Sequence, residues 1–478
     1  MWSKPIQIEA PKQFRRSTYK AERTVILSNN TTIIMKNNSK AIFLALLFFA
    51  ISCSQPTSQL PPTPNWAVNA TIYEVNIRQY SDEGTFDKVT EDLDRIQDLG
   101  AEIIWLMPIN PIGELNRKGS MGSYYSVKDY KAVNPEFGTD EDFRELIKEA
   151  HKRDIKVIID WVPNHTAWDH VWTETNPEFF TKDSTGNFIP PVADWSDVID
   201  LNFDNFEMRE EMIQAMEYWI REFDIDGYRV DVAWGVPTDF HEDVRRRLET
   251  IKPVFMLAEA DMPEHHNYAF DMSYTWGYNG LIYHVAQGDS TLSSIHRLML
   301  IEQERYPDYA YRMYFTTNHD ENSWKGSDPE LYLSNFEPFA IMSATIDGMP
   351  LIYSGQEGIL GRRLEFFEKD AITWNDYPRM AFFEQLLELN QANSALWNGT
   401  AGGPYELIDV NDETGVYGYR RANEKDEVIV WLNISSEPRV VSISGNNTYE
   451  ELFSTQTFSG SDSFSLEAHS GAVFVKKL

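Results

Sequence analysis

The sequence predicts an α/β protein, a (β/α)8 TIM barrel over residues 66–399 with a short inserted loop domain after the third strand. A C-terminal antiparallel β-sandwich domain is expected over residues 400–478. Three observations support this prediction. Short apolar runs alternate with helical patterns as far as residue 397, polar side chains follow several of those runs, and only short alternating segments come after residue 400.

The barrel part contains seven runs that we expect to form strands, at residues 72–77, 102–107, 156–160, 227–231, 254–259, 311–317 and 350–353. Residues 140–152 and 208–223 carry apolar residues at helical spacing. Strands that alternate with helices pair in parallel, and a closed barrel is the simplest arrangement for this many of them. Residues 166–206 interrupt the alternation, and a long insertion at this place is typical of loops that build sites at the strand ends.

The last part of the chain has a different pattern. Short segments with alternating side chains are expected to form antiparallel strands at residues 418–421, 427–432, 440–444 and 472–476. They predict a small β-domain.

Residues 1–53 have the features of a secretory signal. Lys36 and Lys40 precede an apolar run at residues 41–51, which is too short to cross a membrane as a helix. The run is followed by Cys53, and this arrangement resembles a bacterial lipoprotein signal, in which the cysteine becomes lipidated. The alternative is an ordinary signal peptide with a cysteine nearby.

The resemblance implies a protein that is lipid-anchored in the bacterial cell envelope, on the periplasmic or surface face of the outer membrane. We expect translation to start at Met35 and residues 54–65, which are polar and rich in proline, to form a tether. Cys53 is the only cysteine, so its acylation would leave no thiol for disulfides or thiol catalysis. The formal net charge of -32 repels phosphate backbones, and we expect no nucleic-acid partner. The oligomeric state stays open.

Several of the predicted strands lead into a carboxylate or an imidazole. Asp160, Asp231 and Glu259 end three of the runs, and His319 and Asp320 follow a fourth. Because the carboxyl ends of barrel strands meet at one rim, we expect these side chains to converge. Two carboxyl groups roughly 5 Å apart suit retaining hydrolysis of a glycosidic bond, in which one attacks the anomeric carbon and the other protonates the leaving oxygen.

Arg229 lies two residues before Asp231 and therefore projects to the same side of its strand. A charge-assisted hydrogen bond from its guanidinium would hold Asp231 as the anion.

Four segments resemble the conserved regions of the α-amylase family, glycoside hydrolase family 13, and occur in that family's order: DWVPNH, GYRVD, LAEA and FTTNHDEN. The resemblance extends from residue 66 to the C-terminus. It implies Asp231 as the nucleophile and Glu259 as the acid/base. It also implies Asp320 as a third carboxylate that binds sugar hydroxyls. The other substrate-site residues that it implies are Arg229, which would orient Asp231, His165 and His319, which would bind the same sugar, and Tyr125, which would lie beneath it.

Two segments depart from the family pattern. Ser123-Tyr124-Tyr125 stands where many members have His-Gly-Tyr, and Trp234-Gly235 stands where many endo-acting members have Lys-His. We expect Trp234 to present an aromatic surface to sugar on the leaving-group side. The alternative is that Trp234 packs under the neighbouring loop.

Many members of this family bind Ca²⁺ beside the loop that follows the third strand. Asn164 and Asp200 match two of the ligand positions, and their oxygen atoms suit a hard cation. Gly235 replaces a histidine ligand. A hydrogen-bonded site without metal is the alternative.

The resemblance implies a retaining glycoside hydrolase that cleaves α-1,4-glucosidic bonds in starch, maltodextrins or maltooligosaccharides. One alternative is an exo-acting α-glucosidase or a transglycosylase on the same scaffold. Another is a non-catalytic glucan-binding protein. A protein of that kind is expected to lack at least one catalytic carboxylate, whereas this sequence has Asp231, Glu259 and Asp320.

Overall fold

The structure is a computed structural model that describes residues 63–443 and 447–477. The predicted start at Met35, the lipidated Cys53 and most of the tether lie outside the described residues.

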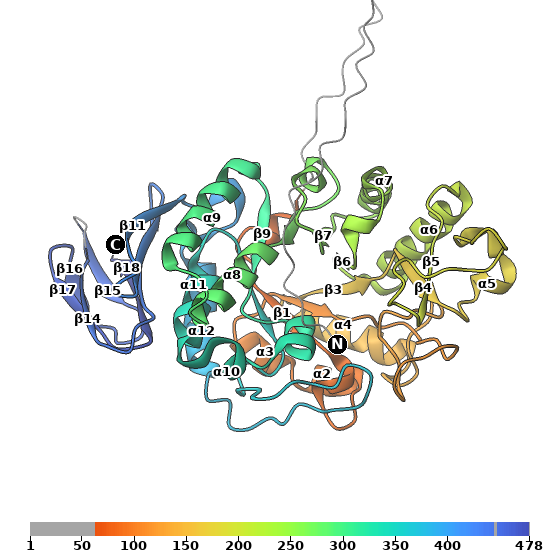
Figure 1. Cartoon of the computed structure of the whole chain (residues 1–478), viewed down its shortest axis with the longest axis horizontal. Helices are drawn as coiled ribbons and strands as arrows, with labels where there is room; N and C mark the ends of the chain where they lie inside the picture. The colour runs from red at the N-terminus through yellow and green to blue at the C-terminus, as the bar shows by residue number, and fades with distance from the viewer. Residues whose placement is uncertain (1–62, 444–446, 478) are drawn as a thin grey trace, which may run out of the picture. The chain divides into compact units, whose positions relative to one another are not determined.

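A closed barrel of parallel strands forms the centre of the structure (Figure 1), in the order β1-β2-β3-β6-β7-β8-β9-β10 with β10 pairing back to β1. The fold class predicted from the sequence is confirmed. The strands are β1 Ile72–Val75, β2 Ile103–Leu106, β3 Lys156–Trp161, β6 Gly227–Val230, β7 Phe255–Ala258, β8 Met272–Tyr274, β9 Tyr311–Tyr314 and β10 Met349–Tyr353.

One of these strands, β8, is not among those predicted from the sequence. It has only three residues, too few for an apolar run or an alternation to stand out. Its position comes from its neighbours, because Met272 pairs with Leu257 of β7 on one side and with Tyr311 of β9 on the other.

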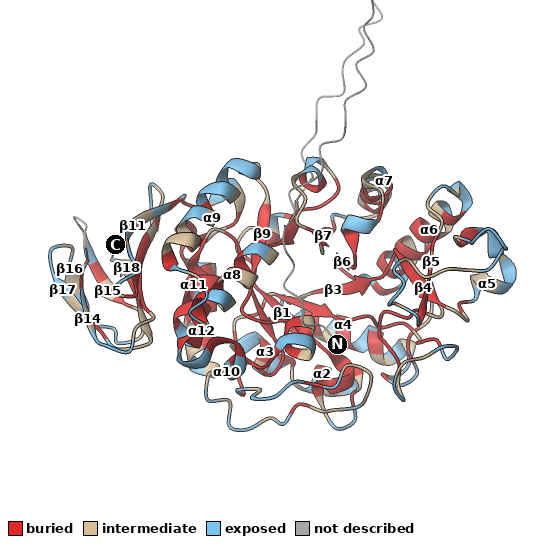
Figure 2. Ribbon diagram, in the orientation of Figure 1, coloured by how far each residue is buried: buried red, intermediate tan, exposed pale blue. Residues whose placement is uncertain are grey.

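The barrel strands are buried on both faces, as Figure 2 shows. One face fills the barrel interior with large apolar side chains, including Trp105, Phe255 and Met313. The other face packs against the surrounding helices. These are α1 Ile77–Tyr80, α2 Phe86–Glu91, α3 Leu93–Asp98, α4 Asp140–Lys152, α6 Phe206–Phe223, α7 Thr238–Glu249, α8 Trp276–Ala286, α9 Leu292–Arg305, α10 Asp328–Tyr332, α11 Phe336–Thr345 and α12 Met380–Ala392.

The insertion after β3 carries short elements of its own, β4 His165–Ala167, α5 Trp172–Thr175 and β5 Val198–Asp200. Strands β4 and β5 pair antiparallel, with His165 opposite Asp200. This pairing returns the chain to the barrel at the start of α6.

The C-terminal part is an antiparallel β-structure. A six-stranded sheet has the order β11-β12-β13-β18-β15-β16, and β14 pairs with β17 in a second sheet. The two sheets enclose an apolar core that includes Ile429, Val441 and Leu466. The strands are β11 Tyr405–Asn411, β12 Val416–Ala422, β13 Glu427–Asn433, β14 Arg439–Ser442, β15 Thr448–Glu451, β16 Thr457–Ser459, β17 Ser463–Leu466 and β18 Ser470–Lys476.

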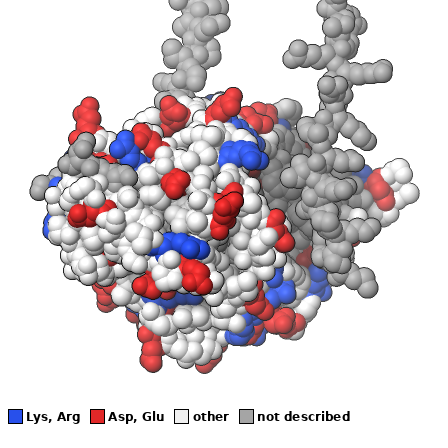
Figure 3. All heavy atoms as spheres, turned by 60° about the vertical axis from the view of Figure 1, so that its left-hand side comes forward, with Lys and Arg blue, Asp and Glu red and all other residues white. Residues whose placement is uncertain are grey.

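Charged side chains of both signs are interspersed on the surface. On the face drawn in Figure 3, the Lys and Arg side chains of the described residues lie between Asp and Glu side chains. Within residues 63–443 and 447–477, no helix is both long and apolar enough to cross a membrane.

Candidate active site

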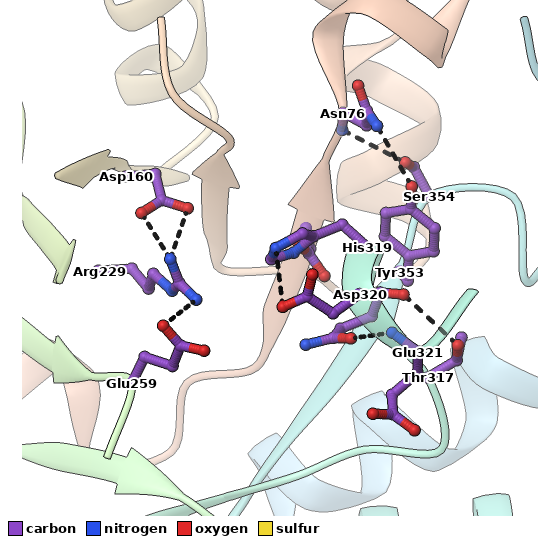
Figure 4. Close-up of polar contacts among 12 residues, drawn as sticks. Asn76, Asp160, Arg229, Glu259, Thr317, His319, Asp320, Glu321, Tyr353 and Ser354 are labelled. Carbon is purple, nitrogen blue, oxygen red and sulfur yellow. Dashed lines mark hydrogen bonds and ion pairs between the residues drawn. The ribbon is translucent and has the colours of Figure 1, made fainter. Parts of the chain in front are cut away.

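Arg229 on β6 contacts three carboxylates at the carboxyl ends of neighbouring strands, and Figure 4 shows two of them, Asp160 and Glu259. Its Nη1 atom donates to Asp160 Oδ1 at 2.8 Å and to Asp231 Oδ1 at 3.1 Å. Its Nη2 atom lies 3.1 Å from Glu259 Oε2, and its Nε donates to the Tyr274 hydroxyl at 3.2 Å. Strands β3, β6 and β7 are adjacent in the barrel, so the predicted convergence of these groups is realised around one buried cation.

Asp231 lies almost entirely out of solvent. Burial and the nearby Glu259 charge raise the pKa of Asp231 well above its usual value, while Arg229 acts in the opposite direction. Among the described residues, no donor contacts Asp231 Oδ2.

Asp160 lies beneath this pair and is fully buried. Burial raises the pKa of Asp160 to about 6, against the opposing effect of Arg229. Its Oδ2 atom accepts a hydrogen bond of 3.0 Å from the Tyr125 hydroxyl.

The backbone after β6 holds Glu259 in place. Val232 has φ 46°, in the left-handed region that β-branched residues rarely adopt. In this conformation its N–H donates to Glu259 Oε2 at 2.7 Å. Backbone strain of this kind costs on the order of 1–3 kcal/mol and is concentrated at functional sites. Arg229 Nη2 and the Val232 amide both contact Oε2, and neither contacts Oε1.

His319 follows β9 and joins the opposite side of the site. Its Nδ1 contacts Glu74 Oε1, its Nε2 lies 2.7 Å from the Tyr125 hydroxyl, and the same nitrogen lies 3.4 Å from Asp320 Oδ2. Burial acts against the charged form of His319, but Asp320 and Glu74 outweigh it and raise the pKa to about 9. His319 is therefore a cation at neutral pH.

Tyr125 lies between the Arg229 group and His319 and contacts both sides of the site. Its ring stacks on His319, with 5.5 Å between the ring centroids, and its hydroxyl bonds both Asp160 and His319. His165 is buried near this group and contacts Trp195 of the insertion at 5.5 Å. Burial lowers the pKa of His165 to about 4, so this histidine is neutral and can both donate and accept.

Trp234 is 56% exposed on a short helix, Ala233–Gly235, directly after β6. The alternative in which it packs under a neighbouring loop disagrees with this exposure. Contact between Trp234 and a sugar stays a prediction.

The residues considered for calcium lie together beside this helix. Asn164 precedes His165, which pairs with Asp200, and a Cβ atom added at Gly235 would lie 2.9 Å from Asn164 Oδ1. The Asn164 amide oxygen, the half-buried Asp200 carboxylate and the backbone carbonyl groups near Gly235 are oxygen donors of the kind that Ca²⁺ prefers. In the part of the chain that the structure describes, no three His, Cys, Asp or Glu side chains are grouped to hold a metal.

Three residues of the site are absent from those predicted from the sequence: Glu74, Trp105 and Tyr274. Glu74 is a fully buried carboxylate inside an apolar strand, and that contrast is a signal the sequence did contain. Trp105 and Tyr274 surround the Arg229 guanidinium at 5.1 Å and 5.6 Å from their ring centroids. Aromatic residues in strands usually belong to the core, so nothing in the local pattern distinguishes these two.

Comparisons with known proteins agree with this geometry. The alpha-amylase catalytic domain family matches residues 11–189 and 192–279, together more than half of the chain. The alpha-amylase of Lactobacillus plantarum has a solved structure that is 31% identical, with a TM-score of 0.76 over 86% of this chain and 99% of that one. The maltogenic alpha-amylase AmyB of Thermotoga neapolitana is 27% identical, with a TM-score of 0.77 over 86% of this chain and 99% of its own.

Alpha-amylase MalA of Haloarcula japonica is 27% identical over 82% of this chain, and this chain covers 59% of that longer protein. Together with the carboxylates around Arg229, these matches establish that the chain belongs to the α-amylase family of glycoside hydrolases.

Proposed function

We propose that the protein is a retaining glycoside hydrolase that cleaves α-1,4-glucosidic bonds in starch, maltodextrins or maltooligosaccharides. The observation that carries this proposal is the Arg229 cluster, in which one buried guanidinium contacts both Asp231 and Glu259. Two carboxyl groups held by one cation at adjacent strand ends suit a nucleophile and an acid/base.

In the first step, Asp231 attacks the anomeric carbon of the bound sugar. Oδ2 is the attacking atom, because Oδ1 is engaged by Arg229 while Oδ2 has no donor among the described residues. Glu259 transfers its proton from Oε1 to the glycosidic oxygen as the C–O bond breaks, since Oε2 already accepts from the Val232 amide. The products of this step are a glucosyl ester on Asp231, a Glu259 carboxylate and a free sugar hydroxyl.

In the second step, Glu259 takes a proton from water and the resulting nucleophile attacks the same anomeric carbon. The ester breaks, Asp231 returns as the anion next to Arg229, and Glu259 is again protonated. Two inversions give overall retention.

The remaining polar groups bind the sugar during both steps. The cationic His319 and the partly exposed Asp320 offer a donor and an acceptor to hydroxyl groups, and neutral His165 offers both. Tyr125 supplies a ring beneath the reacting sugar.

Exo action or transfer to a second sugar is the alternative that one observation favours. Trp234 is exposed on the short helix that follows Asp231. If this helix faces the leaving group, the Trp234 ring can hold an acceptor sugar by stacking. Relatives of this chain include a maltogenic alpha-amylase and trehalose synthases. Product analysis on maltotriose, amylose, pullulan and trehalose separates these activities.

Two matched variants test the roles of the carboxylates with α-maltosyl fluoride, whose fluoride leaves without an acid. Glu259→Gln should form the glycosyl ester and then stall without its base, so that the intact protein gains the mass of one maltosyl group. Asp231→Asn should gain no mass and should release no fluoride. If Asp231→Asn became labelled, the nucleophile would lie elsewhere.

Calcium would serve a structural role, with Asn164 and Asp200 as side-chain ligands. It would link the insertion to the segment after β6 and supply no chemistry in either step.

Lipidation of Cys53 would hold the enzyme at the cell envelope, on the periplasmic or surface face of the outer membrane. This part of the proposal rests on the basic residues, the short apolar run and the single cysteine.

A further inference from the structure

A row of aromatic side chains leads from the site to the surface. The rings of Tyr125 and Phe366 are nearly parallel, with an interplanar angle of 11° and a centroid distance of 6.3 Å. Phe366 in turn contacts Trp324 at 5.1 Å. Tyr125 is buried, Phe366 is half-buried and Trp324 is 53% exposed, so the row ends in solvent.

The backbone that carries Trp324 is held in place by the loop that carries Phe366. Trp324 belongs to a π-helical turn, Glu321–Lys325, that begins directly after Asp320. Arg363 donates to the carbonyl oxygens of Ser323 and Trp324 at 2.8 Å and 3.0 Å. Leu364 N donates to Asn322 Oδ1 at 3.0 Å, and Asn322 Nδ2 donates back to the Arg362 carbonyl at 3.1 Å.

These contacts distinguish Trp324 from an exposed apolar residue on a loose loop. Single exposed hydrophobic residues are common and need no explanation. The backbone of Trp324 is hydrogen-bonded to a neighbouring loop, and its ring continues the aromatic row that begins at Tyr125. Its position relative to the site is therefore fixed. Irregular turns of the π type occur frequently at functional positions.

The row lies on the side of the site away from the proposed acid. Figure 4 shows Glu259 beside Arg229, whereas Asp320 lies on the side of Thr317 and Ser354. The leaving group departs beside Glu259. Trp324 belongs to the turn that directly follows Asp320, so the row continues on the Asp320 side of the site.

We propose that Phe366 and Trp324 form a binding surface for the glucose units that precede the reacting one, on the side opposite the leaving group. The inference rests on the proposed function and adds to it a preference for substrates with a longer glycone. The exposed ring of Trp324 stacks on the apolar face of a glucose unit, and a longer glycone is processed faster than a single glucose.

A series of glycosyl fluorides tests this surface without involving the leaving-group side. Glucosyl, maltosyl and maltotriosyl α-fluorides share one leaving group, so any gain in kcat/KM with length comes from the preceding sugars. For Trp324→Ala we expect the gain on the longest fluoride to fall by about 2- to 12-fold, the ratio that corresponds to 0.5–1.5 kcal/mol. Trp324→Phe keeps a ring and should recover part of the gain.

Two control variants complete the experiment. Phe206→Ala removes an aromatic side chain that is 78% exposed on α6, outside the site, and should leave the whole series unchanged. Trp234→Ala should keep the wild-type dependence on glycone length, because none of the fluorides places a sugar on the leaving-group side.

The outcomes separate this inference from the proposed function. A loss in Trp324→Ala that grows with glycone length supports the surface, and an equal loss or no loss on all three fluorides overturns it. If the wild type released fluoride from none of them, or if Asp231→Asn were as fast as the wild type, the proposed function itself would be wrong.

Discussion

Replacement of Glu74 by Gln tests how the charge of His319 is maintained. Glu74 is fully buried on β1, and its Oε1 contacts His319 Nδ1. The increase in the His319 pKa from 6.5 to about 9 corresponds to ~3 kcal/mol in favour of the cation. Burial acts against the charged form more strongly than Asp320 alone acts for it, so the loss of the Glu74 charge should remove at least half of this increase, ~1.5 kcal/mol.

The sign of the pH effect follows from the raised pKa. The stabilisation from cationic His319 is complete below pH 6.5 and is lost as the pH rises through about 9. In Glu74→Gln this loss should begin at lower pH, and the alkaline limb of kcat/KM should move down by at least about one pH unit. The free energy of unfolding is a weaker readout, because Glu74 Oε2 is buried with no hydrogen-bond partner among the described residues, and its replacement by a neutral group offsets part of the loss.

The assay is kcat/KM on maltotriose between pH 5 and pH 10, with melting temperatures at each pH. Glu102→Gln is the matched control, since burial raises the pKa of Glu102 to about 7 but this residue directly precedes β2, at the opposite end of the barrel. Glu102→Gln should keep the wild-type alkaline limb. An unchanged alkaline limb in Glu74→Gln would refute the argument that Glu74 keeps His319 charged.

Four further predictions address the nucleophile, the leaving-group side, the metal and the anchor. Asp231→Asn should lower turnover by several orders of magnitude while maltooligosaccharide binding persists, and a variant that kept a tenth of wild-type kcat would contradict the assignment. Trp234→Ala should lower kcat/KM selectively on either maltotriose or long amylose, and unchanged activity on both would contradict contact between Trp234 and a sugar. Chelation with EDTA should lower the melting temperature of the wild type and leave that of Asp200→Asn unaffected, and no shift in the wild type would favour the metal-free site. Cys53→Ser should move the protein from membranes into the soluble fraction, and continued membrane association would point to a different anchor.

The sequence by itself determined the fold class and the strand ends at which carboxylates gather. Apolar runs that alternate with amphipathic helices leave few arrangements other than a barrel, and the polar residues after those runs must meet at one rim. The convergence of Asp231, Glu259 and Asp320 at this rim therefore follows from the sequence alone, whereas their roles in the reaction come from the family resemblance. Strand β8 does not, because three residues provide too little periodicity for recognition.

Only the tertiary structure decided which groups touch. Arg229 was expected to hold Asp231, but its contacts with Asp160, Glu259 and Tyr274 depend on the pairing of β3, β6, β7 and β8. Glu74 and His319 are 245 positions apart, and barrel closure between β1 and β10 brings their strands to the same rim. The pKa of His319 and the row from Tyr125 to Trp324 likewise depend on burial and on contacts between distant loops. Local patterns in a sequence encode strands and turns, whereas burial, charge pairing and ring stacking arise only when segments far apart in the chain pack together.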